Sequence, residues 1–272
     1  MSLTQVAVVQ LNSTPDVEQN MRAAERQVRR AAEAHAKLVV LPEAFAYLGP
    51  ESAQQGVAEA LPEGGPLLAR CQSWARELDL ELILGGFWES RPTDSRVYNT
   101  SVHLGRDGAV KALYRKIHLF DVELADGTHL KESDKVAPGE QVVVSETAFG
   151  KLGLSICYDV RFPELYRQLV DQGAIALSVP AAFTLHTGKD HWHVLLQARA
   201  IESQCYVLAA AQAGRCYGSR MSYGHALIVD PWGCVIAQCS GEGEGFVTAE
   251  LDTELVVRLR HQLPSLKNRR LK

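Results

Sequence analysis

Short runs of apolar residues alternate along the chain with segments in which apolar residues return every three or four positions. Residues 5–11 and 37–41 are almost unbroken apolar runs, which predicts strands buried on both faces. Between them, apolar residues recur at helical spacing from 17 to 31, and Ser13 or Thr14 is positioned to cap that helix. Strand, helix and strand in this order are typical of an α/β sheet with parallel neighbours.

The same alternation continues to the end of the sequence and predicts about a dozen strands in two sheets, with helices on the outer faces. Residues 121–140 are polar and irregular, and residues 214–221 read as a glycine-bearing loop. No segment has the composition of an inter-domain linker, so residues 1–272 are expected to form a single domain. The remaining helices are predicted at 66–80, 163–172, 190–204 and 251–263, and the remaining strands at 81–87, 98–104, 152–156, 174–179, 205–211, 224–229, 234–238 and 245–250.

Composition and charge narrow the class of partner. The hydrophobic content of 46% and charged content of 22% are those of an ordinary globular protein. A net charge of -4 argues against nucleic acid and anionic membranes as partners, and favours a small molecule. The first residues lack the pattern of a signal peptide, and no apolar run approaches the ~20 residues that span a bilayer. A cytoplasmic location is therefore expected.

The cysteines and histidines do not form a recognisable metal or disulfide pattern. Six cysteines are irregularly spaced and include no CxxC pair, which argues against a disulfide framework and a zinc site. His191 and His193 stand two positions apart in a predicted helix, so their side chains face different directions. No metal ion is expected.

The segment KLGLSICYDVRFPE, residues 151–164, places Cys157 at the end of an apolar strand. Pro163 and Glu164 suit the first turn of the helix that follows. A thiol at this point would lie among backbone N–H groups able to stabilise a developing oxyanion. From these residues alone Cys157 is either a nucleophile or a small buried hydrophobic side chain.

Three charged residues stand at strand ends or in flanking loops, as Cys157 does. Glu43 follows a predicted strand, and Lys116 and Glu132 lie before and within the irregular segment. Only a few per cent of an ordinary thiol is ionised at neutral pH, so a cysteine hydrolase needs a base, and a carboxylate can fill that role. A nearby lysine would lower the thiol pKa and bind an oxyanion, and a second carboxylate would keep that lysine charged.

Three motifs together resemble a known family. LPEAF (41–45), YRKIHLF (114–120) and SICYDVRFPELYR (155–167) are similar to the signature segments of the nitrilase superfamily, the carbon-nitrogen hydrolases, in order and in spacing. Further similar tracts at 180–184, 187–212 and 223–233 extend the resemblance over nearly the whole chain. The resemblance implies a four-layer αββα sandwich that forms homodimers or larger homo-oligomers, with no metal and no organic cofactor.

The resemblance also implies a role for each matching residue. Cys157 would be the nucleophile and Glu43 the general base. Lys116 would stabilise the oxyanion together with the backbone N–H of Tyr158, and Glu132 matches the second glutamate of the family in its placement. The implied reaction is hydrolysis of an amide through a cysteine thioester.

The tracts around the cysteine are most similar to the Nit branch of the superfamily, which implies an amide of a small 2-oxo acid as substrate. Deaminated glutathione is the expected substrate, and 2-oxoglutaramate or 2-oxosuccinamate is the alternative. Arg161 is expected to bind the carboxylate of the 2-oxo acid, unless it pairs with Asp159 or Glu164. Phe183 and Thr187 would line the acyl pocket by resemblance.

Two further activities stay open at this point. A nitrilase proper would use the same cysteine, glutamate and lysine, although the flanking tracts favour an amidase. A non-catalytic scaffold would be expected to have lost one of the four central residues, and all four are present. In the loop at 214–221, Arg215 and Arg220 could meet a second carboxylate, but are expected to face water.

Overall fold

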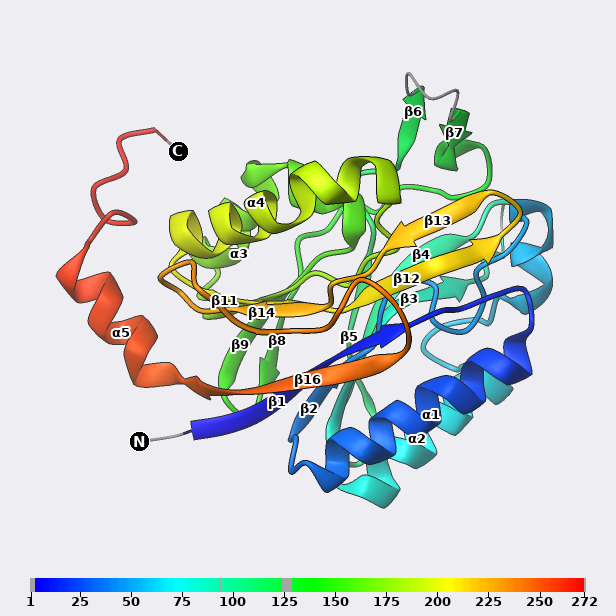
Figure 1. Ribbon diagram of the computed structural model, residues 1–272, viewed down its shortest axis with the longest axis horizontal. Helices are drawn as coiled ribbons and strands as arrows, with labels where there is room; N and C mark the ends of the chain where they lie inside the picture. The colour runs from blue at the N-terminus through cyan, green and yellow to red at the C-terminus, as the bar shows by residue number, and fades with distance from the viewer. Residues whose placement is uncertain (1–2, 93, 124–128, 272) are drawn as a thin grey trace.

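The computed structural model describes residues 3–92, 94–123 and 129–271. Two large sheets lie face to face, with a pair of helices on each outer side (Figure 1). This is the four-layer αββα sandwich that the sequence predicted. In the described part of the chain, no helix combines the length and the apolarity needed to cross a membrane.

The first sheet carries the start and the end of the chain. Its strands follow one another in the order β13 (Arg220–Tyr223), β12 (Ala211–Tyr217), β1 (Leu3–Leu11), β2 (Leu38–Val40), β3 (Glu81–Glu89), β4 (Tyr98–Leu104) and β5 (Val110–Arg115). One further strand, β16 (Gly245–Asp252), pairs with β1. β1 pairs with β2 and β12 in parallel and with β16 in antiparallel orientation. Its central position agrees with its unbroken apolar sequence.

The second sheet carries the cysteine. Its order is β15 (Val235–Gln238), β14 (Leu227–Val229), β11 (Tyr206–Ala209), β10 (Ala176–Ser178), β9 (Gly150–Leu154) and β8 (Val144–Thr147). β9, β10 and β11 are parallel neighbours, so their carboxyl ends meet at one edge. A small separate ribbon, β6 (Asp121–Glu123) with β7 (His129–Lys131), lies within the segment predicted as irregular.

The helices cover the outer faces. Helices α1 (Val17–Glu33) and α2 (Pro66–Leu78) pack on the first sheet, and α3 (Pro163–Asp171) and α4 (Leu185–Ser203) on the second (Figure 1). Side chains of β1 alternate accordingly: Val6 and Val8 face the second sheet, whereas Val9 faces α1 and α2. Helix α5 (Thr253–Gln262) follows β16, and short 3₁₀ helices occur as η1 (Glu51–Val57), η2 (Glu132–Asp134) and η3 (Cys157–Arg161).

Three sequence-based expectations need correction. The N-cap of α1 is Asp16 and not Ser13 or Thr14. Its carboxylate accepts the N–H of Gln19, because the helix begins only at Val17, after Pro15. Helix α4 begins at Leu185, five residues earlier than predicted. The segment predicted as a loop at 214–221 is a hairpin, in which β12 and β13 pair across a turn at Gly218.

Candidate active site

Cys157 occupies a strained turn at the carboxyl end of the second sheet. The chain leaves β9 and enters η3 at Cys157, whose φ of 48° lies in the left-handed region that residues other than glycine seldom adopt. The N–H of Cys157 donates to the carbonyl oxygen of Pro180 at 2.9 Å, which holds this conformation. The side chain is 8% exposed and lines a cavity between the sheets.

Glu43 reaches the same cavity from the first sheet. It follows β2, is 6% exposed, and accepts hydrogen bonds on both oxygens. Oε1 accepts from Nζ of Lys116 at 3.0 Å and from Nδ2 of Asn99 at 2.9 Å, and Oε2 accepts from the N–H of Ala182 at 2.8 Å. Ala182 follows β10 of the second sheet, so the carboxylate is fixed by groups from both sheets.

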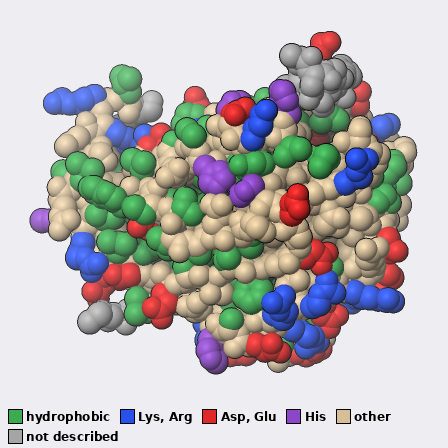
Figure 2. All heavy atoms as spheres, viewed as in Figure 1, with side chains coloured by type: hydrophobic (Ala, Val, Ile, Leu, Met, Phe, Trp, Pro, Cys, Tyr) green, Lys and Arg blue, Asp and Glu red, His purple; other side chains and the backbone are tan. Residues whose placement is uncertain are grey.

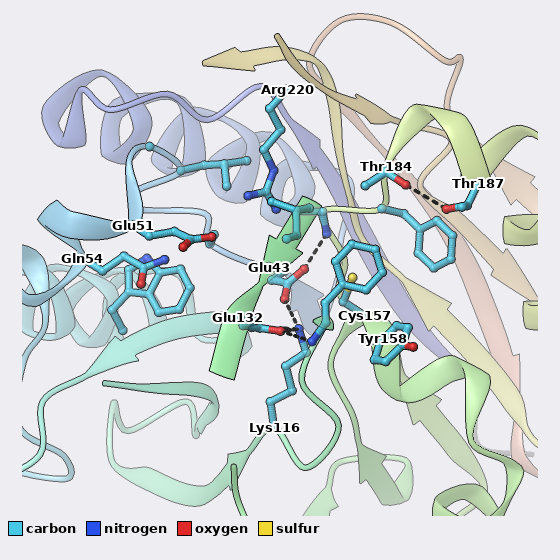
Figure 3. A pocket seen from close by; sticks show the side chains of 18 of the residues that line it. Glu43, Glu51, Gln54, Lys116, Glu132, Cys157, Tyr158, Thr184, Thr187 and Arg220 are labelled. Carbon is cyan, nitrogen blue, oxygen red and sulfur yellow. Dashed lines mark hydrogen bonds and ion pairs between the residues drawn. The ribbon is translucent and has the colours of Figure 1, made fainter. Parts of the chain in front are cut away.

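Lys116 lies between two carboxylates (Figure 3). Lys116 is only 2% exposed. Its ammonium group donates to Oε1 and Oε2 of Glu132 at 3.1 and 2.9 Å, in addition to Oε1 of Glu43. Oε2 of Glu132 also accepts the N–H of Phe120 at 2.6 Å, which fixes the second carboxylate. The ammonium group of Lys116 is therefore held in place by both glutamates.

The pKa values of these groups follow from burial and mutual charge. Burial raises the pKa of Glu43, but the charge of Lys116 and the hydrogen bonds from Cys157 and Ala182 lower it below its ordinary value. Burial and the charge of Glu43 raise the pKa of the Cys157 thiol well above its usual range, against the opposing effect of Lys116. Burial lowers the pKa of Lys116, and the two glutamates raise it further than burial lowers it. The resting site holds a carboxylate, a neutral thiol and an ammonium group.

The lysine has the expected effect on the thiol, because the charge of Lys116 lowers the thiol pKa. Burial and the neighbouring carboxylate outweigh it, so the net shift is upward. The thiol therefore needs Glu43 as a proton acceptor before it can act as a nucleophile.

Sequence reasoning missed Asn99, which joins the two glutamates. Its Nδ2 donates to Glu43 at 2.9 Å and lies 3.5 Å from Oε1 of Glu132, while the side chain is buried in β4. The available signal was a polar residue inside an otherwise buried strand, which usually needs a specific partner.

Replacing Asn99 with alanine is expected to lower kcat/KM by about 10- to 100-fold, because a hydrogen bond to a charged group is removed from the base. Loss of that donor also raises the pKa of Glu43, so the acid limb of the pH profile should move to higher pH. The matched control is Ser101→Ala on the same strand, whose hydroxyl has no hydrogen-bond partner among the described residues. An unmoved acid limb in Asn99→Ala would show that Asn99 does not position the base.

Asp159 was also missed, because it was considered only as a partner for Arg161. The structure buries its carboxylate completely, and it accepts from the N–H of Ile156 at 2.9 Å and from the hydroxyl of Tyr114 at 2.7 Å. It further accepts from the N–H of His118 at 3.1 Å. Asp159 thus ties the cysteine turn to the segment that carries the lysine.

Arg161 pairs with neither of the carboxylates suggested by the sequence. Its Nη1 lies 3.3 Å from Nδ1 of His191, and its guanidinium lies over the rings of Phe183 and Tyr158, at 5.2 and 5.9 Å from their centroids. Among the described residues no carboxylate lies within ion-pair distance of Arg161. Thr187 stands nearby, with its hydroxyl 2.8 Å from that of Thr184.

One cavity collects all of the site residues predicted from the sequence, together with several that were not predicted. Arg220 is the main addition: it was expected to face water, but it is partly buried and lines the cavity, whereas Arg215 on the same hairpin is exposed. Within the described residues, no three His, Cys, Asp or Glu side chains are arranged to hold a metal ion. The predicted residues on the cavity wall are Glu43, Lys116, Glu132, Cys157, Tyr158, Arg161, Phe183 and Thr187.

Comparison with known proteins gives a consistent result. Residues 5–261 match the family model described as carbon-nitrogen hydrolase. The chain is 46% identical to the deaminated glutathione amidase of Homo sapiens, covering 97% of this chain and 82% of that protein. It is 44% identical to the deaminated glutathione amidase of Synechocystis, covering 97% of each. The crystal structure of Saccharomyces cerevisiae Nit3, a member of branch 10 of the nitrilase superfamily, superposes with a TM-score of 0.89 at 35% identity, over 99% of this chain and 97% of that one.

Proposed function

Because this chain belongs to the carbon-nitrogen hydrolase family, we propose that it is an amidase in which Cys157, Glu43, Lys116 and Glu132 act together on a small 2-oxo acid amide. The observation that carries the proposal is the environment of Glu43. Its ionised carboxylate is hydrogen-bonded to a neutral thiol and to a buried ammonium group. The carboxylate can therefore take the proton of the thiol, and the ammonium group can stabilise an oxyanion.

The first half of the reaction forms a thioester. Glu43 takes the thiol proton as Cys157 attacks the amide carbonyl, and the negative charge develops on the carbonyl oxygen. The ammonium of Lys116 and the backbone N–H of Tyr158 stabilise that charge. Tyr158 lies in the first turn of η3, where backbone N–H groups have no hydrogen-bond acceptor within the helix. Glu43 then passes the proton to the leaving nitrogen, and the C–N bond breaks.

The second half consumes a water molecule. Glu43, again ionised, takes a proton from water as the oxygen attacks the thioester carbon, and the same donors stabilise the second oxyanion. The C–S bond breaks, the thiolate recovers the proton from Glu43, and the free acid leaves. Glu132 keeps Lys116 charged and in place throughout, as its two hydrogen bonds to Nζ support.

The substrate that fits best is deaminated glutathione, cleaved into 2-oxoglutarate and cysteinylglycine. Relatives with this name are 44% to 46% identical over nearly the whole chain. Arg161, with no carboxylate partner of its own among the described residues, binds the carboxylate beside the 2-oxo group. Phe183 and Thr187 form the wall for the acyl chain between that carboxylate and Cys157.

A substrate panel tests this assignment. Deaminated glutathione, 2-oxoglutaramate and a simple aliphatic nitrile are incubated with the protein, and the products are followed by mass. The highest kcat/KM is expected for deaminated glutathione. A preference for 2-oxoglutaramate would reassign the protein as an ω-amidase, and turnover of the nitrile alone would make it a nitrilase.

We further infer a single-domain, cytoplasmic homodimer. Pairing of β16 with β1 joins the end of the chain to its start, which supports one domain over residues 1–272. All six cysteines are unpaired, which suits a reducing compartment. A fluorescent fusion that localised to another compartment would contradict the location.

The dimer is expected to form through α4. Val194 and Ile201 on this helix are 65% and 53% exposed, and Trp232 beside its far end is 59% exposed. On the face shown in Figure 2, hydrophobic and histidine side chains lie over and beside α4, with a few charged side chains among them. Sedimentation equilibrium should give a molecular mass of twice the chain mass for the wild type. The Val194→Glu variant should give a mass closer to that of a single chain. A wild-type protein that stays monomeric at micromolar concentration would contradict this assembly.

A further inference from the structure

The cavity has a second wall on the far side of Glu43 from the acyl pocket. Figure 3 shows Arg220 pointing from the edge strand β13 toward Glu43, with Glu51 and Gln54 to one side of the glutamate and Tyr158 and Thr187 to the other. Glu51 and Gln54 belong to η1. None of the steps described above uses this wall.

Two polar atoms on this wall have no hydrogen-bond partner in the part of the chain that the structure describes. Nε of Arg220 and Oε1 of Gln54 are both buried, and neither has a hydrogen-bond partner among the described residues. Buried polar groups are nearly always paired, so an unpaired guanidinium N–H beside a cavity indicates a missing ligand. Arg220 contacts the ring of Tyr217, 5.9 Å from its centroid, but within the described residues no carboxylate lies at ion-pair distance.

The chemistry decides which part of a substrate reaches this wall. Glu43 must deliver its proton to the leaving nitrogen, so the leaving group has to lie beside Glu43. The acyl part extends the other way, toward Arg161 and Phe183. The leaving group therefore points toward Arg220 and Gln54.

Charge supplies the second argument. The cavity holds two arginines without a carboxylate partner among the described residues, Arg220 and Arg161. Arg161 lies over the ring of Tyr158, which Figure 3 shows on the other side of Glu43 from Gln54. Deaminated glutathione carries two carboxylates, one at the 2-oxo acid end and one at the glycine end. 2-Oxoglutaramate, which releases only ammonia, carries one.

We propose that Arg220 binds the terminal carboxylate of the leaving dipeptide, while the side-chain amide of Gln54 faces its peptide group, so that this wall is a leaving-group subsite. The inference rests on the proposed amidase function and adds a specificity-determining residue to it. Arginine suits the task because its planar fork matches a carboxylate with two parallel hydrogen bonds. Glu51 lies on the same wall and would repel a carboxylate, so the carboxylate of the leaving group has to lie within reach of Arg220.

The test removes the charge from each partner in turn. Arg220→Gln and the wild-type protein are assayed on deaminated glutathione and on its analogue with a carboxamide in place of the glycine carboxylate. The wild type is expected to prefer the acid by about 10- to 100-fold in kcat/KM, and Arg220→Gln to lose that preference. Arg220→Lys, which keeps the charge without the fork, should recover part of it. Arg215→Gln, at an exposed position on the same hairpin, serves as the matched control.

The outcomes separate this inference from the proposed function. A wild type that hydrolyses 2-oxoglutaramate but not deaminated glutathione overturns the substrate, and the subsite with it. A wild type active on deaminated glutathione, with Arg220→Gln reduced equally on the acid and on the carboxamide, overturns the subsite alone, since Arg220 would then act through Glu43 or through the fold. Unchanged kinetics in Arg220→Gln would also overturn it. Thermal unfolding of each variant shows whether the hairpin remains folded.

Discussion

Replacing Cys157 with alanine is expected to abolish hydrolysis, with kcat falling by about 10⁴-fold or more, because no thioester can form without the sulfur. The fold should persist, since alanine can keep the hydrogen bond from the backbone N–H to Pro180 and removes only the sulfur atom of a residue that lines the cavity. The measurement is product release under substrate saturation, with thermal unfolding as the check on the fold.

The control for this experiment is Cys234→Ala, which removes an exposed thiol away from the cavity. It is expected to keep full activity. A Cys157→Ala protein that still turns over substrate at a comparable rate would eliminate covalent catalysis by this residue, whatever the effect of the other substitutions.

Replacing Lys116 with methionine is expected to remove activity and also to destabilise the protein, by about 3–5 kcal/mol in the free energy of unfolding. The reason is that the buried Glu43 and the half-buried Glu132 remain beside each other without the ammonium that compensates both. Repulsion between these two neighbouring carboxylates raises the pKa of one of them, so the variant should become relatively more stable as the pH falls and that group takes up a proton. Chemical unfolding across the acidic range measures this.

A double variant separates the two effects of Lys116. Lys116→Met combined with Glu132→Gln leaves a single buried carboxylate, so it should recover part of the lost stability while hydrolysis stays absent. Recovery of activity in the double variant would contradict the role of Lys116 at the oxyanion. A single variant as stable as the wild type would mean that the two glutamates are hydrated in its absence.

The parts of the fold that follow a local pattern could be predicted from the sequence. The apolar strand at 5–11 is central because both of its faces are apolar, and α1 follows from helical spacing alone. Glu43 and Cys157 could be singled out because each follows the carboxyl end of a buried strand, which is where α/β sheets bind their ligands. Lys116 and Glu132 needed the family resemblance, since nothing local marks them.

What could not be predicted depends on contacts between distant segments. Arg220 lies in GRCYGSRM, a segment whose glycines suggest a loop, and only its pairing with β12 turns it into a strand that reaches the cavity. Asp159 is two residues from Arg161, yet its carboxylate points toward Tyr114 and His118 on the lysine segment. Sequence proximity suggested a pair with Arg161, and the direction of the side chains within the 3₁₀ turn excluded it.

The central claim is that the acyl group of the substrate passes through the sulfur of residue 157. The most direct test is to quench the protein with acid during steady-state hydrolysis of deaminated glutathione and to locate the adduct by mass spectrometry of the intact chain and of its peptides. The account predicts one 2-oxoglutaryl group per chain, confined to the peptide that contains Cys157 and discharged when substrate is exhausted. A fully active protein in which this peptide never gains mass, or in which the adduct lies on another residue, would contradict it.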